Sequence, residues 1–237
     1  MTFDITIPVL NEEKTLDRQV RILYDFLSDH FPKKGQWQIV IADNGSTDNT
    51  LAIAHALSQE INAIKVVKVP RRGVGLALKT AWAQSDADLV GYMDLDLATD
   101  LPHFLTTYQA LAEQNYDLVY ATRLHRNSKV IGRTLKREIT SRIFNFILKM
   151  YLGVRVSDGM CGFKFLQRKH FDTLHQAGAI SDGWFFSTEL LTIAEWKKLR
   201  LYELPVKWTD DPDSRVNIPN LAKQYLAAMR ELKKRRE

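Results

Sequence analysis

The sequence predicts an α/β domain in which helices flank a mostly parallel central sheet. Short β-rich runs with apolar residues on both faces alternate with segments of helical periodicity, the order typical of a parallel sheet covered on both sides. The 237 residues are 45% hydrophobic and 26% charged, which suits one large domain and excludes a disordered chain. No long Pro/Gly/Ser-rich linker divides the sequence, so we expect a single domain with a helical tail.

The first half predicts alternating strands and helices. β-Rich apolar runs indicate strands at residues 3–10, 38–42, 64–69, 88–93 and 117–121. Between them, apolar spacing predicts helices from Leu16 to Leu27, from the Thr47 or Asp48 cap to Leu57, and at 75–84 and 101–114.

The second half is less regular. We expect a long amphipathic helix at 133–152, a strand at 162–166, a helix at 184–197, a strand at 201–208 and a helix at 219–236. The 133–152 helix gathers apolar residues on one side: Ile139, Ile143, Phe146, Ile147 and Met150. Its aromatic residues, Phe144, Phe146 and Tyr151, are expected in the core or against a membrane.

The net charge of +5 conceals an uneven distribution. Residues 1–122 hold 10 Lys/Arg and 16 Asp/Glu, whereas residues 123–155 hold nine Lys/Arg and one Glu. Such a basic block indicates an anionic partner, which could be phosphate, nucleic acid or anionic lipid. A solvated helix face is the alternative interpretation.

Cysteine content and hydropathy bear on location. The single cysteine, Cys161, excludes an internal disulfide and fits a reducing compartment. No run of 18 apolar residues is present, and the N-terminal MTFDITIPVL predicts a strand and not a signal peptide. We therefore expect a cytoplasmic protein, with peripheral attachment to the cytoplasmic face of a membrane as an extension of that expectation.

Polar residues gather where the predicted strands end. They are Pro8, Asn11 and Glu12 after the first strand, Asp43 after the second, Gly73 and Gly75 after the third, Asp94 and Asp96 after the fourth, and Arg123 after the fifth. Ligands of doubly wound sheets bind at this edge. Turn formation and helix capping explain any one of these positions equally well, but the recurrence at five strand ends favours a binding site.

The central feature is Asp94-Leu95-Asp96. In extended backbone two residues that are two positions apart point to the same side. Mg²⁺ and Mn²⁺ prefer such oxygen ligands, with phosphate oxygens completing the coordination shell. Because the pair directly follows the buried run LVGYM, we predict a Mg²⁺ or Mn²⁺ site at Asp94 and Asp96.

An ordered set of motifs spans residues 4–217: IPVLNEE, IADNGSTDNT, RRGVGLALKTA, DLDLATD, ATR before a basic helix, VSDGMCGFKFL and ELPVKWTDDPDSRV. In order and spacing they resemble the family-2 glycosyltransferases with the GT-A fold. The similarity is greatest to the dolichyl-phosphate mannose synthase and polyprenyl-phosphate glucosyltransferase branch. The resemblance implies a Rossmann-like GT-A domain over 1–217, with a nucleotide-sugar half (1–122) and an acceptor half (123–217), followed by a basic amphipathic helix over 218–237.

The resemblance also implies residue roles. Nucleotide-sugar contacts would come from Pro8, Asn11, Glu12, Asp43, Gly73, Gly75, Asp94, Asp96 and Arg123. Acceptor-phosphate contacts would come from Arg133, Arg137, Ser141, Arg142, Lys164 and Arg215. The catalytic set would be Asp94, Asp96, Asp158, Glu189, Arg137 and Arg142. Three positions depart from the family pattern: Asn44, Val74 and Ala98. The last of these favours a glucosyltransferase with a uridine donor over a mannose synthase.

The leading hypothesis is a metal-dependent, inverting transfer of a hexose from a nucleotide-sugar to a polyprenyl or dolichyl phosphate. UDP-glucose is the favoured donor and GDP-mannose the alternative. A saccharide or small-molecule hydroxyl acceptor would instead require a general base, for which Asp158 and Glu189 are candidates. A nucleic-acid-binding protein and a non-catalytic nucleotide-binding module are weaker alternatives. The sequence predicts no oligomeric state.

The basic tail at 223–237 interleaves Leu226, Met229 and Leu232 with Lys and Arg. Such a segment suits either a membrane-surface helix or a solvated C-terminal helix. We expect peripheral contact with anionic membranes through this tail.

Overall fold

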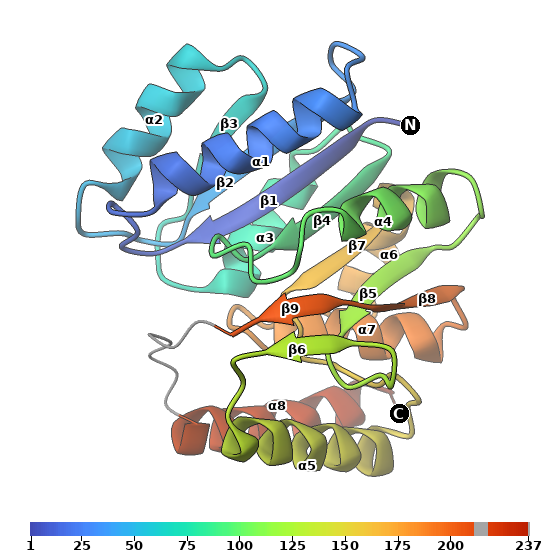
Figure 1. The fold of residues 1–237 in the computed structure, drawn as a ribbon. Coiled ribbons are helices and arrows are strands. Elements are labelled where there is room, and N and C mark those ends of the chain that lie inside the picture. Colours follow the sequence, from blue (N-terminus) through green and yellow to red (C-terminus); the bar gives the residue numbers. More distant parts are fainter. Residues whose placement is uncertain (211–217, 237) are drawn as a thin grey trace.

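The computed structural model of the protein describes residues 1–210 and 218–236. In this part of the chain the main sheet has seven strands: β1 (Phe3–Val9), β2 (Trp37–Asp43), β3 (Ile64–Lys68), β4 (Leu89–Met93), β5 (Leu118–Thr122), β7 (Phe163–Gln167) and β8 (Leu201–Pro205). The helices are α1 (Leu16–His30), α2 (Thr50–Glu60), α3 (Val74–Ala83), α4 (His103–Ala112), α5 (Leu135–Leu152), α6 (Phe171–Gln176), α7 (Phe186–Trp196) and α8 (Ile218–Arg236) (Figure 1). The predicted α/β class is confirmed.

The strand order is β3-β2-β1-β4-β7-β5-β8. All neighbouring pairs are parallel except those of β7, which runs antiparallel between β4 and β5. The carboxyl ends of β1 to β5 therefore share one edge of the sheet, and β7 begins at that same edge. This reversal brings the loop before β7 to the polar strand ends.

The predicted strand at 201–208 is two strands. After β8 the chain leaves the main sheet at Val206, and β9 (Lys207–Thr209) pairs in parallel with β6 (Lys129–Ile131), a strand that the periodicity did not predict. An isolated bridge from Trp208 to Thr99 ties this small sheet to the loop after β4. The small sheet thus lies between the main sheet and α5 (Figure 1).

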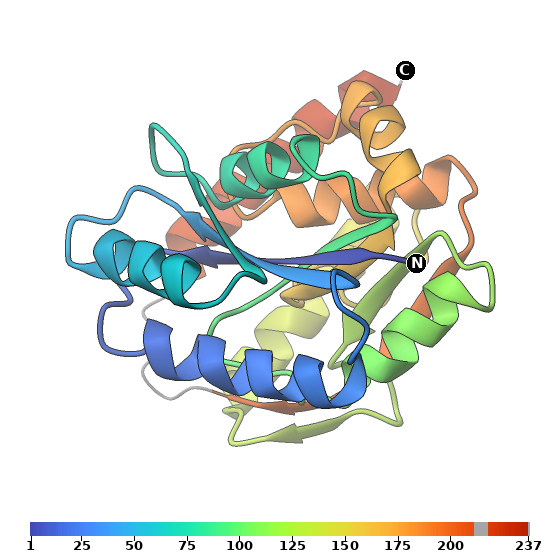
Figure 2. The ribbon, with the colours of Figure 1, turned by 90° about the horizontal axis from the view of Figure 1, so that it is seen from above.

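Helices cover both faces of the main sheet (Figure 2). One face packs against α1, α2 and α4 through a cluster that includes Leu16, Leu57 and Phe104. The other packs against α3, α5, α6, α7 and α8, with Trp82 and Phe186 fully buried there. The second predicted helix begins slightly later than expected, at Thr50, but its Asp48 carboxylate still accepts a hydrogen bond from the Thr50 N–H at 3.0 Å.

The α5 helix presents its apolar side to solvent. Ile139, Ile143, Phe146 and Met150 are exposed, whereas Ile147 is partly buried. The inward side carries Ser141, Asn145, Leu148 and Leu152. The polar inward residues are engaged: Asn145 accepts a hydrogen bond from the Gly159 N–H at 2.8 Å, and Ser141 accepts one from Arg133. This helix therefore uses polar side chains to hold the loops of the site.

The C-terminal helix α8 packs beside α5 (Figure 1). Its Tyr225, Met229 and Leu232 are buried in the cluster beneath the sheet, and Leu226 remains 45% exposed. The apolar side on which the expected membrane contact of the tail depended is thus mostly used inside the protein. Within residues 1–210 and 218–236, no helix combines the length and apolar character needed to cross a bilayer.

Replacing Gly91 by alanine should destabilise the centre of the sheet. A Cβ at Gly91 would lie 2.0 Å from Cδ1 of Phe165 on the neighbouring strand β7, so the phenyl ring or the strand must move. We expect Gly91→Ala to lower the free energy of unfolding by about 1–3 kcal/mol, measured by urea denaturation. Gly183→Ala is the matched control, because a Cβ there meets open space. Equal denaturation midpoints for the two variants would contradict this packing argument.

Candidate functional site

The loops after β1 and β2 are joined by side-chain hydrogen bonds. Asn11 accepts a hydrogen bond from the Thr47 N–H at 2.8 Å, and its own N–H donates to Ser46 Oγ at 3.0 Å. Glu12 accepts from the Thr15 hydroxyl at 2.5 Å. Pro8, which is partly buried, lies one residue before the end of β1. These contacts form one wall of the strand-end site.

Asp43 is fully buried beside this wall and is only partly hydrogen-bonded. Its Oδ1 accepts from the Ser46 N–H at 3.2 Å. Its Oδ2 has no hydrogen-bond partner among the described residues. Buried carboxylate oxygens are nearly always paired, so this oxygen is suited to accept an N–H from a bound ligand.

The predicted metal residues lie together after β4. Asp94 is partly buried and Asp96 is exposed, with Asp96 Oδ1 accepting from the Ala98 N–H at 2.9 Å. Burial, together with the nearby charge of Asp96, raises the pKa of Asp94 to about 7. A divalent cation held by Asp94 and Asp96 would offset the repulsion that helps to raise the pKa of Asp94.

Few protein side chains are placed to bind the metal ion. Among the described residues no group of three His, Cys, Asp or Glu side chains is arranged to hold a metal. A hard cation such as Mg²⁺ is commonly held by one or two carboxylates, with substrate phosphates and water completing its shell. The pair of Asp94 and Asp96 fits that arrangement.

Gly162 allows the loop before β7 to approach Asp94. A Cβ built on Gly162 would lie 1.9 Å from Oδ2 of Asp94, which no side chain could accommodate. The glycine therefore fixes where the Asp94 carboxylate can lie. This follows from the antiparallel register, in which Phe163 pairs with Met93.

Arg123 and Asp158 form a buried ion pair at the end of β5. Arg123 Nε lies 2.8 Å and Nη2 3.0 Å from the two Asp158 oxygens, and the Arg123 N–H donates to the same carboxylate at 3.1 Å. Burial alone would raise the pKa of Asp158, but the charge and hydrogen bonds of Arg123 lower it to about 2. Asp158 is therefore a permanent anion that positions Arg123.

Lys164 does not reach the surface of the site. It is fully buried in β7, where its Nζ donates to the carbonyls of Gly159 at 3.2 Å and Cys161 at 2.6 Å. Burial lowers its pKa to about 8. Lys164 thus holds the loop between Arg123 and Asp94. Its predicted contact with the acceptor phosphate stays a prediction.

A basic pocket of about 590 Å³ lies between the β5 end and the start of α5. Its lining consists of Arg123, Leu124, His125, Arg126, Ser128, Val130, Arg133, Leu135, Glu138 and Arg142. The Arg133 side chain is only 6% exposed, and Nη1 lies 3.2 Å from Glu138 Oε2. Its Nε and Nη1 nevertheless have no hydrogen-bond acceptor among the described residues. A buried guanidinium with unsatisfied donors is suited to an anionic ligand.

Of the other residues predicted to contact the acceptor phosphate, only some lie at the pocket. Ser141 supports Arg133, and Arg142 lines the pocket while paired with Glu138 at 2.7 Å. The structure does not bring Arg137 to the pocket lining, because both Asp210 oxygens lie 2.6 Å from its Nη1. Arg215 lies outside the described residues.

The glycine loop contacts protein. A Cβ on Gly73 would lie 2.6 Å from the Asp182 carbonyl oxygen, and one on Gly75 would lie 2.3 Å from that of Ser181. Asn44, one of the departures from the family pattern, accepts from the Gly73 N–H. The two glycines therefore permit close packing of the loop at 181–183, and their predicted nucleotide contact stays a prediction.

Glu189 holds the start of that loop, at residues 180 and 181, through hydrogen bonds. Its carboxylate accepts from the Ile180 N–H at 3.0 Å, the Ser181 N–H at 2.8 Å and the Ser181 hydroxyl at 2.7 Å. Arg235 of α8 adds an ion pair at 3.2 Å. Glu189 is fully buried with both oxygens engaged, so it is a structural anchor in this conformation.

Trp208 is a site residue that the sequence patterns did not predict. Its ring lies under two guanidinium groups, 5.2 Å from Arg123 and 5.8 Å from Arg133, and cation–π attraction orients both. Arg126, His125 and Ser128 of the pocket were also not predicted individually. An aromatic residue within the KWTDD motif was the only available signal.

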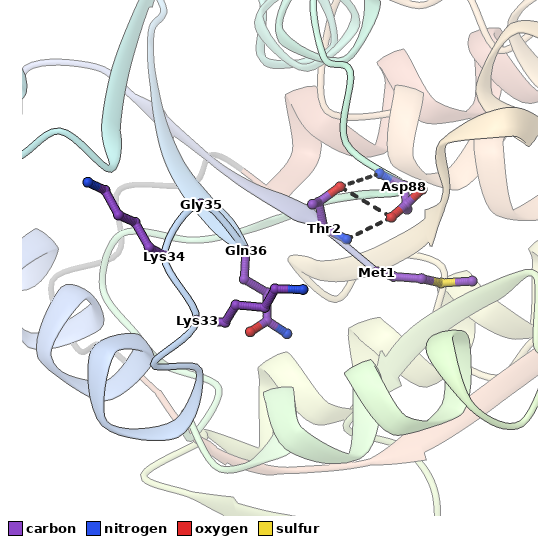
Figure 3. Close-up of a pocket in the computed structure, with 7 residues that line it drawn as sticks. All are labelled: Met1, Thr2, Lys33, Lys34, Gly35, Gln36 and Asp88. Atoms are coloured by element: carbon purple, nitrogen blue, oxygen red, sulfur yellow. Dashed lines mark hydrogen bonds between the residues drawn. The ribbon is translucent and has the colours of Figure 1, made fainter.

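A second pocket of about 260 Å³ lies at the opposite edge of the sheet (Figure 3). Met1, Thr2, Lys33, Lys34, Gly35, Gln36 and Asp88 line it. The Asp88 carboxylate is engaged by the Thr2 N–H at 2.7 Å. This pocket lies away from the strand ends and shares none of their side chains.

Replacing Asp158 by asparagine should destabilise the fold, because Arg123 would keep its charge in a buried setting without a counterion. We expect Asp158→Asn to lower the free energy of unfolding by about 3–5 kcal/mol at pH 7, measured by urea denaturation. Asp172→Asn is the matched control, since its ion pair with Arg168 involves a carboxylate that is 64% exposed. A loss no larger than that of the control would refute the structural role of the buried pair.

Comparison with known proteins places the sequence in a family. The sequence model described as "Glycosyl transferase family 2" matches residues 4–174. Glycosyltransferase AglD of Haloferax volcanii is 30% identical over 90% of this chain, which spans only 34% of the AglD length. Dolichyl-phosphate beta-glucosyltransferase of Drosophila melanogaster is 26% identical over 91% of this chain and 69% of its own.

Solved structures share the fold. Glucosyl-3-phosphoglycerate synthase from Mycobacterium tuberculosis, in complex with Mn²⁺, UDP-glucose and phosphoglyceric acid, superposes with a TM-score of 0.70. The two chains are 22% identical, and the match covers 98% of this chain and 80% of that one. The family match covers well over half of the sequence and includes the Asp94/Asp96 pair, Arg123 and the loop before β7. The chain therefore belongs to glycosyltransferase family 2.

Proposed function

We propose that this protein transfers a hexose, with inversion, from a nucleotide-sugar to a polyprenyl or dolichyl phosphate, using Mg²⁺ or Mn²⁺. UDP-glucose is the favoured donor, with GDP-mannose as the alternative. The observation that carries the proposal is the basic pocket next to the donor residues, in which the Arg133 guanidinium is nearly buried and its Nε has no hydrogen-bond partner among the described residues.

The donor side is supported by two features. The unpaired Asp43 Oδ2 can accept the ring N–H that both uracil and guanine present. Asp94 and Asp96 would hold the cation, which supplies charge stabilisation to the diphosphate leaving group. The relative from Drosophila melanogaster, named as a dolichyl-phosphate beta-glucosyltransferase, favours glucose as the sugar. The solved enzyme in complex with Mn²⁺ and UDP-glucose favours a uridine donor.

The chemistry follows from the charges. A phosphate oxygen of the acceptor attacks the anomeric carbon, a new C–O bond forms, and the bond to the donor diphosphate breaks. Negative charge thus moves from the acceptor to the nucleoside diphosphate. Arg133 would orient the acceptor phosphate, and Arg123, between this pocket and Asp94, would stabilise the charge on the leaving group.

A hydroxyl acceptor is disfavoured by the state of the two candidate bases. Asp158 has a pKa of about 2 and is held by Arg123, so it is a poor proton acceptor. Glu189 accepts four hydrogen bonds from the 180–181 loop and Arg235. An ionised phosphate needs little help from a base, which fits this site.

Arg133→Ala should impair use of the acceptor and leave donor binding intact. We expect kcat/KM for a short-chain polyprenyl phosphate to fall about tenfold to a hundredfold, because a charged hydrogen-bond donor is lost. Transfer of radiolabelled glucose from UDP-glucose with Mn²⁺, in detergent, measures this effect. Arg200→Ala, at the amino end of β8, is the control. Undiminished transfer in Arg133→Ala, or transfer to an unphosphorylated polyprenol, would refute the proposed acceptor site.

Metal-dependent donor binding should weaken in acid. Because the pKa of Asp94 is about 7, the carboxyl must release a proton to bind a cation at lower pH. We expect the affinity for UDP-glucose with Mn²⁺ to be about tenfold lower at pH 6 than at pH 8, measured by calorimetry. UDP-glucose is chosen because its diphosphate does not titrate in this range. Asp96→Ala should abolish the Mn²⁺-dependent part of binding, and equal affinity at both pH values would contradict the assignment.

A further inference from the structure

The outer face of α5 is an apolar stripe that none of the described residues covers. Leu135 is 74% exposed, Ile139 48%, Ile143 55%, Phe146 63% and Met150 72%. These residues recur every three to four positions, so they share one side of the helix. A helix of a folded domain normally turns such a stripe to the core, and a contiguous exposed one marks an interaction surface.

Basic side chains border the stripe along its length. Lys136 and Arg142 are exposed and Lys149 is partly buried, all on the same helix. Glu138, the one acidic residue between positions 123 and 155, is held by Arg133 and Arg142.

The far end of the stripe is also basic. There Lys233 of α8 lies 4.5 Å from the Tyr151 ring, and Lys234 follows it in the last turn of α8. An apolar stripe with cationic borders is complementary to an anionic lipid surface, where acyl chains meet phosphate groups.

The near end of the stripe opens on the basic pocket. Leu135, its first residue, lines that pocket together with Arg133 and Arg142. A surface lying against α5 would therefore hold its phosphate groups next to the arginines that line this pocket.

From this placement we infer that the outer face of α5, from Leu135 to Met150, docks on an anionic lipid bilayer. The inference rests on the proposed lipid-phosphate acceptor, because docking would let the polyprenyl chain stay in the bilayer while its phosphate enters the pocket. The tail helix contributes charge and little apolar surface, since its Met229 and Leu232 are buried. A second copy of this chain is a less suitable occupant, because face-to-face packing would bring two basic borders together.

The experiment is co-sedimentation of the full chain with vesicles of neutral phosphatidylcholine, or of phosphatidylcholine with 30% phosphatidylglycerol. We expect binding to the anionic vesicles that weakens at high salt. The double variant Ile143→Asn/Phe146→Asn should reduce vesicle partitioning at least tenfold. Ile22→Asn, which alters a 44% exposed apolar residue on α1, should bind as the parent does. Lys136→Gln/Lys149→Gln should reduce binding to anionic vesicles only.

Two further measurements separate this inference from the proposed function. The Ile143/Phe146 variant should keep parental turnover with a detergent-dispersed acceptor and lose it with acceptor embedded in vesicles. Unchanged vesicle binding by that variant overturns the docking surface, even if transfer to lipid phosphate is found. A concentration-dependent dimer that this variant abolishes in sedimentation velocity would assign the face to a second copy, and would also overturn it.

Discussion

The buried ion pair between Arg123 and Asp158 is the interaction on which the site depends. Arg123 follows β5, Asp158 precedes β7, and each charge would be costly to bury alone. Their pairing fastens the loop at 158–162 across the strand ends, where Gly162 meets the Asp94 carboxylate and Lys164 gathers the loop carbonyls. The same Arg123 lies over Trp208, which extends the constraint to the small sheet and to Arg133. One buried contact thus helps to position the proposed donor residues, the basic pocket and α5.

Local patterns predicted much of this arrangement. The parallel half of the sheet and its helices follow from periodicity, and the polar strand ends follow from topology. The direction of β7 could not be predicted, because a short apolar run is the same in either orientation. The break between β8 and β9 at Val206 could not be predicted for a similar reason, because a continuous β-rich run does not show where the chain changes its partner strand. The α5 pattern showed that the helix is amphipathic, but nothing in it showed that Ser141 and Asn145 would face the protein.

The acidic first half of the sequence and the basic block at 123–155 form two different electrostatic regions in the structure. On the proposed donor side, Asp43 has one carboxylate oxygen without a hydrogen-bond partner among the described residues, which suits it to receive an N–H group. Asp94 lies close enough to the charge of Asp96 for its pKa to rise, which suits the two residues to bind a cation. On the proposed acceptor side, arginines line a pocket in which Glu138 is the only carboxylate among the described lining residues. The basic block is not simply a solvated face, because Arg133 and Arg123 lie largely buried within it. Three predicted site residues contact other parts of the protein: Arg137 contacts Asp210, Lys164 the Cys161 carbonyl, and Glu189 the 180–181 loop. Their predicted roles toward the substrates stay predictions.

Because α5 turns its apolar side outward, the two sides of the helix have different roles. Its inner residues hold Arg133 and the Gly159 loop, so changes there would disturb the pocket. Its outer residues contribute little to the folded core, because their side chains remain largely exposed. Substitutions on the outer face therefore cost little folding stability, so the polarity of this face can change without disturbing the pocket behind it.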